Sequence, residues 1–74
     1  MAYYFTSKVR QEIGRNIRKA RKKKGLKQVD IAVDAGINPS YYGKIERGIV
    51  NPSLEKIHKI IKSLDVKSSD ILPF

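Results

Sequence analysis

Small and polar side chains gather in the segment NPSYYGKIERG, residues 38–48, in a pattern suited to contact with DNA. Pro39, Ser40, Gly43 and Lys44 are spaced so that a helix would carry them on one face. The major groove, about 12 Å wide, accepts a helix only when the outward face is small or polar. A lysine there can reach guanine acceptors or phosphate, and a serine can bond to base edges. We therefore expect these four residues to face the bases.

The rest of the sequence lacks the patterns of catalytic or metal sites. It contains no cysteine, which excludes disulfides, thiolate metal sites and cysteine nucleophiles. The single histidine, His58, has only Glu55 as a sequence neighbour of the right type, whereas a metal or catalytic site needs more partners. The chain also has no glycine-rich phosphate loop. We expect no enzymatic activity, no cofactor and no metal.

The charge of the chain is unevenly distributed. Residues 1–27 carry ten Lys or Arg against one acid and so account for the whole net charge of +9, while residues 28–74 carry six of each sign. Such asymmetry favours a polyanionic partner, either nucleic acid or an acidic membrane surface, over a face that serves only solubility. No apolar run approaches the ~18 residues that span a bilayer, and a signal-peptide pattern is missing. We expect a cytoplasmic protein without membrane contact.

Two long amphipathic helices are predicted to build the core. The first begins at Thr6 or Ser7 and ends near Lys24, because Gly25 can close a helix. Its apolar stripe consists of Val9, Ile13, Ile17 and Ala20. The second follows the tripeptide NPS at residues 51–53, and its stripe consists of Leu54, Ile57, Ile60, Ile61 and Leu64. A final short turn is expected to be capped by Ser68 or Ser69.

Two short helices are expected between the long ones. Residues 28–35 form the first, which ends at Gly36 and offers for burial Val29, Ile31, Ala32 and Ala35. The second has Asn38 as its N-cap and Pro39 in its first position, and it ends at Gly48. Two helices joined by a short glycine-containing turn are the helix-turn-helix signature. In that motif the second helix enters the major groove and the first crosses the phosphate backbone.

Five helices with short connections predict a compact all-α fold. No segment alternates with period two, so no strand is expected. We assign residues 6–74 to a single helix-turn-helix DNA-binding domain and residues 1–5 to an N-terminal extension. The aromatic residues of this extension, Tyr3, Tyr4 and Phe5, are expected to pack on the protein or on a partner.

The chain resembles the phage Cro and repressor type of helix-turn-helix protein, the XRE family. The resemblance covers about residues 13–72 and rests on three linked stretches, IRKARKKKGLKQVDIA, AGINPSYYGKIERG and NPSLEKIHKIIKSLDV. Because these motifs agree in order and spacing, the signal is strong. It implies a lambda-repressor-like domain of five helices with the helix-turn-helix at helices two and three.

The resemblance also implies roles for single residues. The glutamine that opens the second helix, here Gln28, would touch a phosphate, and the position of Tyr41 would reach the DNA backbone. We add Lys27 and Arg47 as phosphate contacts, together with the backbone amides around Ser53. Pro39 and Gly43 replace residues that commonly read bases in the family. Specificity is therefore expected from Lys44, Ser40, Tyr41 and the deformability of the operator.

One charged pair is expected to serve the fold. The family pairs an arginine late in the first helix with a glutamate near the end of the third, positions held here by Arg21 and Glu46. A carboxylate near the C-terminus of its own helix opposes the helix dipole and needs a cationic partner. Next to it, Tyr42 is expected to pack in the core with its hydroxyl at the edge, not to stack on bases.

These features predict a sequence-specific transcriptional regulator that binds a palindromic operator as a homodimer, with half-sites ~34 Å apart. Residues 71–74 and the outer face of the fourth helix are candidates for the dimer interface, although residues 71–74 could equally cover the core of one chain. Asp30 and Asp34 could contact RNA polymerase, but plain exposure is favoured. The alternative function is a protein-binding adaptor or an antitoxin component with the same fold. A phage repressor and a controller of a restriction–modification operon fit the sequence equally well.

Overall fold

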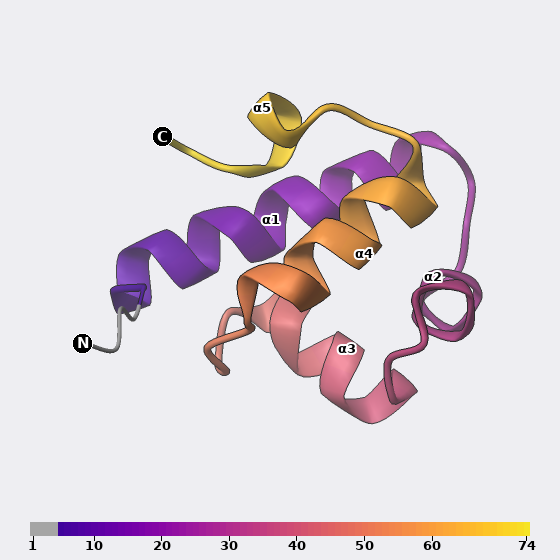
Figure 1. Ribbon diagram of the computed structural model, residues 1–74, viewed down its shortest axis with the longest axis horizontal. Helices are drawn as coiled ribbons and strands as arrows, with labels where there is room; N and C mark the ends of the chain where they lie inside the picture. Colours follow the sequence, from indigo (N-terminus) through magenta and orange to yellow (C-terminus); the bar gives the residue numbers. More distant parts are fainter. Residues whose placement is uncertain (1–4) are drawn as a thin grey trace.

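The computed structural model describes residues 5–74, which form five α-helices and contain no strand (Figure 1). The all-α prediction is therefore confirmed. The helices are α1 (Ser7–Lys23), α2 (Gln28–Ala35), α3 (Pro39–Arg47), α4 (Leu54–Leu64) and α5 (Ser68–Ile71). Tyr3 and Tyr4, placed by the sequence in an N-terminal extension, lie outside the described residues.

Side chains at the helix starts account for the boundaries. The Thr6 hydroxyl accepts a hydrogen bond from the Val9 N–H at 3.2 Å, and the Asn38 side chain accepts from the N–H groups of Ser40 and Tyr41 at 2.9 and 3.2 Å. Such caps satisfy N–H groups that lack a partner within the helix. The predicted starts of α1 and α3 are confirmed.

The cap of α5 differs from the prediction. Its N-cap is Lys67, and the Asp70 carboxylate accepts the Lys67 N–H at 3.1 Å. Neither Ser68 nor Ser69 is the cap, so that prediction is wrong. An aspartate three residues into the turn performs the capping from inside the helix.

The core lies where the two long helices meet the three short ones. Its largest fully buried side chains are Ile13, Ile17, Ile31, Tyr42, Ile45, Ile57, Ile60, Leu64 and Ile71. Two residues predicted to be available for burial are exposed instead, Val29 by 48% and Leu54 by 66%. Each stands in the first turn of its helix. Val29 lies on a different face from Ile31, whereas Leu54 shares the face of Ile57 but stands at the very end of the helix. Helical spacing alone could not reveal where the neighbouring helices stop.

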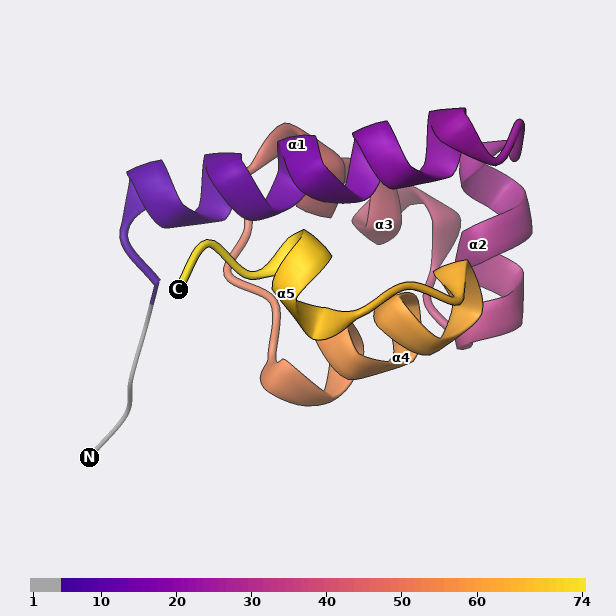
Figure 2. The same cartoon turned by 90° about the horizontal axis from the view of Figure 1, so that it is seen from above.

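The helices pack around α1 on two sides (Figures 1 and 2). α3 packs along one side of α1, and α5 lies on the other side, while α2 packs mainly against α4 and α3. Phe5 belongs to this fold, because its ring lies 6.1 Å from that of Phe74 and its backbone exchanges hydrogen bonds with the Asn51 side chain. Phe5 thus packs on the protein, as expected for the aromatic residues of the N-terminal extension, and the boundary after residue 5 stays a prediction.

Two glycines let α3 approach α1 closely. A Cβ atom added at Gly14 would lie 2.6 Å from the carbonyl oxygen of Ile45 and would also collide with the carbonyl of Glu46. Gly48, which ends α3 as predicted, has a φ of +72°, and a Cβ there would lie 2.7 Å from the Gln11 Cα. The position of α3 is thus fixed by backbone contact at its last two turns.

Candidate nucleic-acid interface

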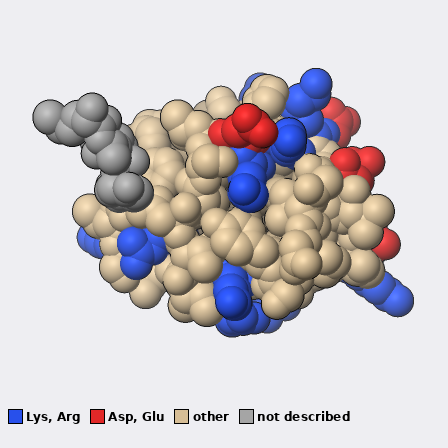
Figure 3. All heavy atoms as spheres, turned by 60° about the horizontal axis from the view of Figure 1, so that its bottom comes forward, with Lys and Arg blue, Asp and Glu red and all other residues tan. Residues whose placement is uncertain are grey.

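The outward face of α3 combines small and polar residues, as predicted. Pro39, Ser40 and Lys44 are exposed on this face, and Pro39 and Ser40 are the first two residues of the helix. Figure 3 brings the side of the molecule that carries α3 forward and shows a largely uncharged surface, with Lys and Arg side chains around it and Asp and Glu side chains toward the top and the right. A face of small and polar residues with cations around it suits a DNA groove, whose floor presents base edges and whose borders carry phosphates.

Gly43 differs from its companions because it is buried. A Cβ at this position would lie 3.5 Å from Arg47 Nη1 and 3.6 Å from Gln28 Oε1, so those two side chains lie over the glycine. In this structure the room left by the missing side chain is occupied by these two longer neighbours, and the base-facing role of Gly43 stays a prediction.

The buried carboxylate of Glu46 links α3 to α1 and α2 by hydrogen bonds. Glu46 is only 5% exposed and accepts hydrogen bonds from Arg21 Nε at 2.7 Å and Arg21 Nη2 at 3.1 Å. The ion pair expected between these residues is therefore present, and its bidentate form is the strong geometry for a guanidinium and a carboxylate. The Tyr42 hydroxyl donates to Glu46 Oε2 at 2.6 Å, and Gln28 Nε2 donates to Glu46 Oε1 at 3.0 Å.

These hydrogen bonds set the protonation of the cluster. Burial alone would raise the pKa of Glu46, but the hydrogen bonds from Arg21, Tyr42 and Gln28 outweigh burial and bring the pKa below its usual value. Burial, reinforced by the hydrogen bond to Glu46, raises the pKa of the Tyr42 phenol. Glu46 is thus charged and Tyr42 neutral at pH 7, and no buried side-chain polar atom among the described residues lacks a hydrogen-bond partner.

The sequence did not reveal that Tyr42 and Gln28 would join this cluster. Tyr42 is fully buried, so its core position agrees with the prediction, but its hydroxyl lies inside on Glu46 and not at the edge. Tyr42 and Glu46 are four residues apart on one helix and therefore share a face, which was an available signal. The contact of Gln28 with Glu46 depends on how α2 is placed against α3, and no local spacing predicts it.

The remaining candidates for phosphate contact lie around this face. Lys27 is exposed just before α2, and Tyr41 is half-buried with Lys56 Nζ 5.5 Å from the centre of its ring. The Ser53 hydroxyl accepts the Lys56 N–H at 3.2 Å, so it caps α4. The backbone N–H groups at the start of α4, which the sequence suggested, and the O–H donor of Ser53 remain for an anion at that position.

The two acidic candidates on α2 already have partners within the chain. Asp30 accepts the Lys27 N–H at 2.8 Å, and Asp34 accepts a hydrogen bond from the Ser63 hydroxyl at 2.7 Å. Both carboxylates therefore contribute to the fold. A contact with RNA polymerase stays a prediction.

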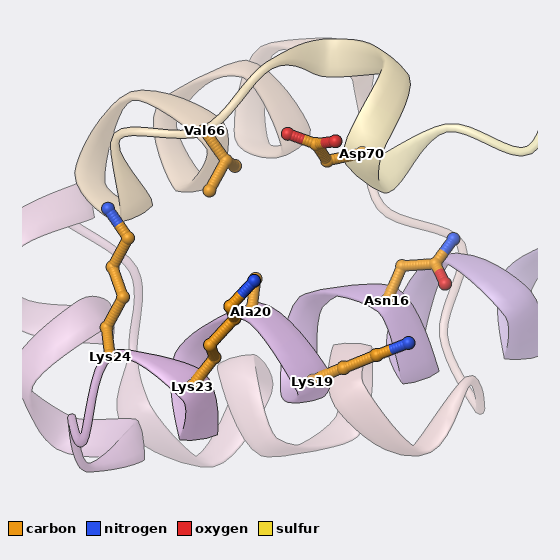
Figure 4. Close-up of a pocket in the computed structure, with 7 residues that line it drawn as sticks. All are labelled: Asn16, Lys19, Ala20, Lys23, Lys24, Val66 and Asp70. Atoms are coloured by element: carbon orange, nitrogen blue, oxygen red, sulfur yellow. The ribbon is translucent and has the colours of Figure 1, made fainter.

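A hollow lies between α1 and the segment around α5, away from the exposed face of α3 (Figure 4). It has a volume of about 500 Å³ and is lined by Asn16, Lys19, Ala20, Lys23, Lys24, Val66 and Asp70. Lys24 Nζ donates to the Asp65 carbonyl at 3.3 Å, next to the C-terminus of α4. Cations at helix C-termini offset the negative end of the dipole. We therefore assign Lys24 to the fold and not to the DNA-binding face.

Among the described residues, no cluster of histidine and acidic side chains could hold a metal ion, and no helix is long and apolar enough to cross a bilayer. The buried hydrogen-bonded side chains gather around α3 instead. Helices α2 and α3, the turn between them and the buried Arg21–Glu46 pair together form a helix-turn-helix with its second helix exposed.

Comparison with known proteins agrees with this arrangement. The family HTH_3, described as helix-turn-helix, matches residues 17–71. The chain belongs to this family. It is 42% identical over 60 residues to the HTH-type transcriptional regulator SlrR of Bacillus subtilis, covering 80% of this chain and 40% of SlrR. It is 36% identical over 70 residues to the control protein C.BamHI of Bacillus amyloliquefaciens, covering 93% of this chain and 86% of that protein.

Solved structures of this helix-turn-helix type include restriction–modification controllers. C.AhdI from Aeromonas hydrophila matches with a TM-score of 0.81 and 35% identity, covering 85% of this chain and 96% of that chain. C.Esp1396I, solved as a tetramer in complex with its natural 35 base-pair operator, matches with a TM-score of 0.77 and 28% identity, covering 82% and 80% of the two chains. The predicted lambda-repressor-like fold and XRE-type helix-turn-helix are confirmed.

Proposed function

We propose that this helix-turn-helix protein is a sequence-specific DNA-binding transcriptional regulator without catalytic activity. The observation that carries the proposal is the exposed, small and polar face of α3, formed by Pro39, Ser40 and Lys44, on a helix whose other face is fixed to α1. Such a face fits a major groove, and the rigid attachment fixes the angle at which α3 would enter it. The operator complex of the similar C.Esp1396I supports DNA as the partner.

In this proposal, residues at the edges of the exposed face of α3 attract DNA of any sequence. Lys27 and Tyr41 are assigned to phosphate contact, together with the backbone at Ser53, while Lys44 and Ser40 are assigned to base edges. Gln28 and Arg47, which the sequence assigned to phosphates, are both exposed next to Gly43. A cytoplasmic location is part of the proposal.

We further propose that the protein binds as a homodimer. One helix of nine residues reads too few base pairs for useful specificity, and a two-fold dimer doubles the site. Ile71 is fully buried in the core of its own chain, whereas Phe74 is 75% exposed beside Phe5. Leu72, Pro73 and Phe74, together with the outer face of α4, where Leu54 is exposed, therefore remain as candidates for the dimer contact.

Selection of a binding site from random duplex DNA tests this function. The wild-type protein should enrich one palindromic site, bind it far more tightly than random duplex, and lose affinity steeply as salt rises. Lys44→Ala should lower the preference for the site, whereas Arg15→Ala, which removes an exposed cation on α1, should preserve it. Failure of the wild type to shift any duplex at low salt would refute the proposal and favour the protein-binding adaptor.

A further inference from the structure

Two side chains from different helices lie beside Gly43 at the centre of α3. Gln28, the first residue of α2, brings Oε1 to 3.6 Å from the place a Cβ of Gly43 would occupy, and Arg47 brings Nη1 to 3.5 Å from the same place. Helical side chains point back toward the N-terminus, so Arg47 naturally covers the residue one turn before it. Both side chains are exposed, whereas Gly43 beneath them is buried.

A hydrogen bond to a buried carboxylate holds the Gln28 side chain in this position. Its Nε2 donates to Glu46 Oε1 at 3.0 Å, and Glu46 is in turn held by Arg21 and Tyr42. A glutamine amide has two N–H donors and a carbonyl acceptor. One donor is engaged by Glu46, so the second donor and the carbonyl remain for a ligand on the exposed side.

We infer that Gln28 and Arg47 together read bases at the centre of α3, in place of the side chain that Gly43 lacks. The inference rests on the proposed DNA-binding function. A glutamine that presents one donor and one acceptor matches the N7 and N6 edge of adenine, and an arginine matches the O6 and N7 edge of guanine. The pair therefore supplies hydrogen-bonding groups at a position where the sequence suggested that none exists.

Gly43 has a definite role in this arrangement. A methyl group fits in ordinary contact with both neighbours, but a longer side chain would occupy their place and push both aside. Glu46 is a positioning residue in the same scheme, since it orients Gln28 without being exposed to DNA.

The test is a binding panel in which the site selected by the wild type is varied one base pair at a time. Gln28→Ala and Arg47→Ala should each lose roughly tenfold or more of the discrimination at one or two base pairs and preserve the preference elsewhere. Gly43→Ala should bind the same site within a few-fold of the wild type. Arg15→Ala, which removes an exposed cation of α1, is the matched control for Arg47→Ala and should leave every preference unchanged.

Thermal melting shows which variants are folded, and only folded variants are compared. A lost base preference is therefore not confused with a lost fold. A uniform loss of affinity across the panel for both Gln28→Ala and Arg47→Ala would overturn the inference, because uniform loss is the behaviour of phosphate contacts. Loss of binding in a folded Gly43→Ala would also overturn it, since the glycine backbone itself would then face DNA. If the wild type selected no site, the proposed function itself would fail, which is a different result.

Discussion

Gly14 and Gly43 allow a matched test of the packing described above. Both stand in the interior of a helix, where alanine is favoured over glycine by about 0.8–1 kcal/mol because it loses less backbone entropy on folding. Their surroundings differ sharply. Gly14 faces backbone carbonyls of α3, whereas Gly43 has only the ends of two flexible side chains near it. The same substitution should therefore change stability in opposite directions.

The magnitudes follow from the contacts. At Gly14 a methyl group would lie 2.6 Å from the Ile45 carbonyl oxygen, well inside the 3.4–4 Å of ordinary contact, so the backbones of α1 and α3 must separate. Such overpacking costs about 1–3 kcal/mol, which exceeds the gain in helix propensity and leaves a net loss of about 1–2 kcal/mol. At Gly43 both neighbours lie at 3.5–3.6 Å, and a net gain of about 0.5–1 kcal/mol remains.

Thermal and urea unfolding of the two variants measure this difference. About 1 kcal/mol shifts the melting temperature by ~4–8 °C in a domain of this size, so the two variants should melt roughly 6–24 °C apart. An unchanged or raised melting temperature for Gly14→Ala would refute the close approach of α1 and α3. A destabilised Gly43→Ala would show that the Gln28 and Arg47 side chains are less free to adjust than their exposure indicates.

Three further outcomes are expected. Tyr42→Phe removes a hydrogen bond to a buried carboxylate without a change of shape and should lower the free energy of unfolding by about 1.5–3 kcal/mol in urea titrations. Folding lowers the pKa of Glu46, so the contribution of Glu46 to stability is complete above its unfolded pKa of about 4.3 and is lost as the pH falls through its folded pKa. Thermal melts below pH 4 should therefore show a loss of stability in the wild type that Glu46→Gln lacks. Phe74→Ser should weaken dimerisation in analytical ultracentrifugation with little change in monomer folding, and an unchanged dimer would remove Phe74 from the interface.

The helices were predictable from the sequence because their signals are local. Asn38 and Pro39 mark the start of α3, and glycines mark the ends of α2 and α3, at the residues where the structure places them. The apolar stripes of α1 and α4 identified most of the core by their period. Errors occurred in first turns, at Val29 and Leu54, because burial there depends on how far a neighbouring helix extends.

The organisation of the reading face was not predictable in the same way. That Gly14 touches α3, and that Gln28 crosses to Gly43, depends on the relative placement of helices distant in sequence. The family resemblance supplied the Arg21–Glu46 pair but assigned Gln28 to a phosphate and Gly43 to the bases. Local spacing cannot show that one residue's missing side chain leaves room for two others.

Glu46 connects the stability of the fold with the surface that we assign to DNA. Its carboxylate joins Arg21 on α1 to Tyr42 on α3, and the same oxygen that accepts from Arg21 Nη2 also accepts from Gln28. Removing one partner of a buried charged pair costs about 3–5 kcal/mol, a large fraction of the stability of a small domain. Substitution at Glu46 must therefore change folding and the position of Gln28 together, and neither effect can be read alone. Gln28→Ala removes one hydrogen bond to the carboxylate while Arg21 and Tyr42 still hold it, so it should lower stability less than substitution of Glu46 and allow base preference to be measured in a folded protein.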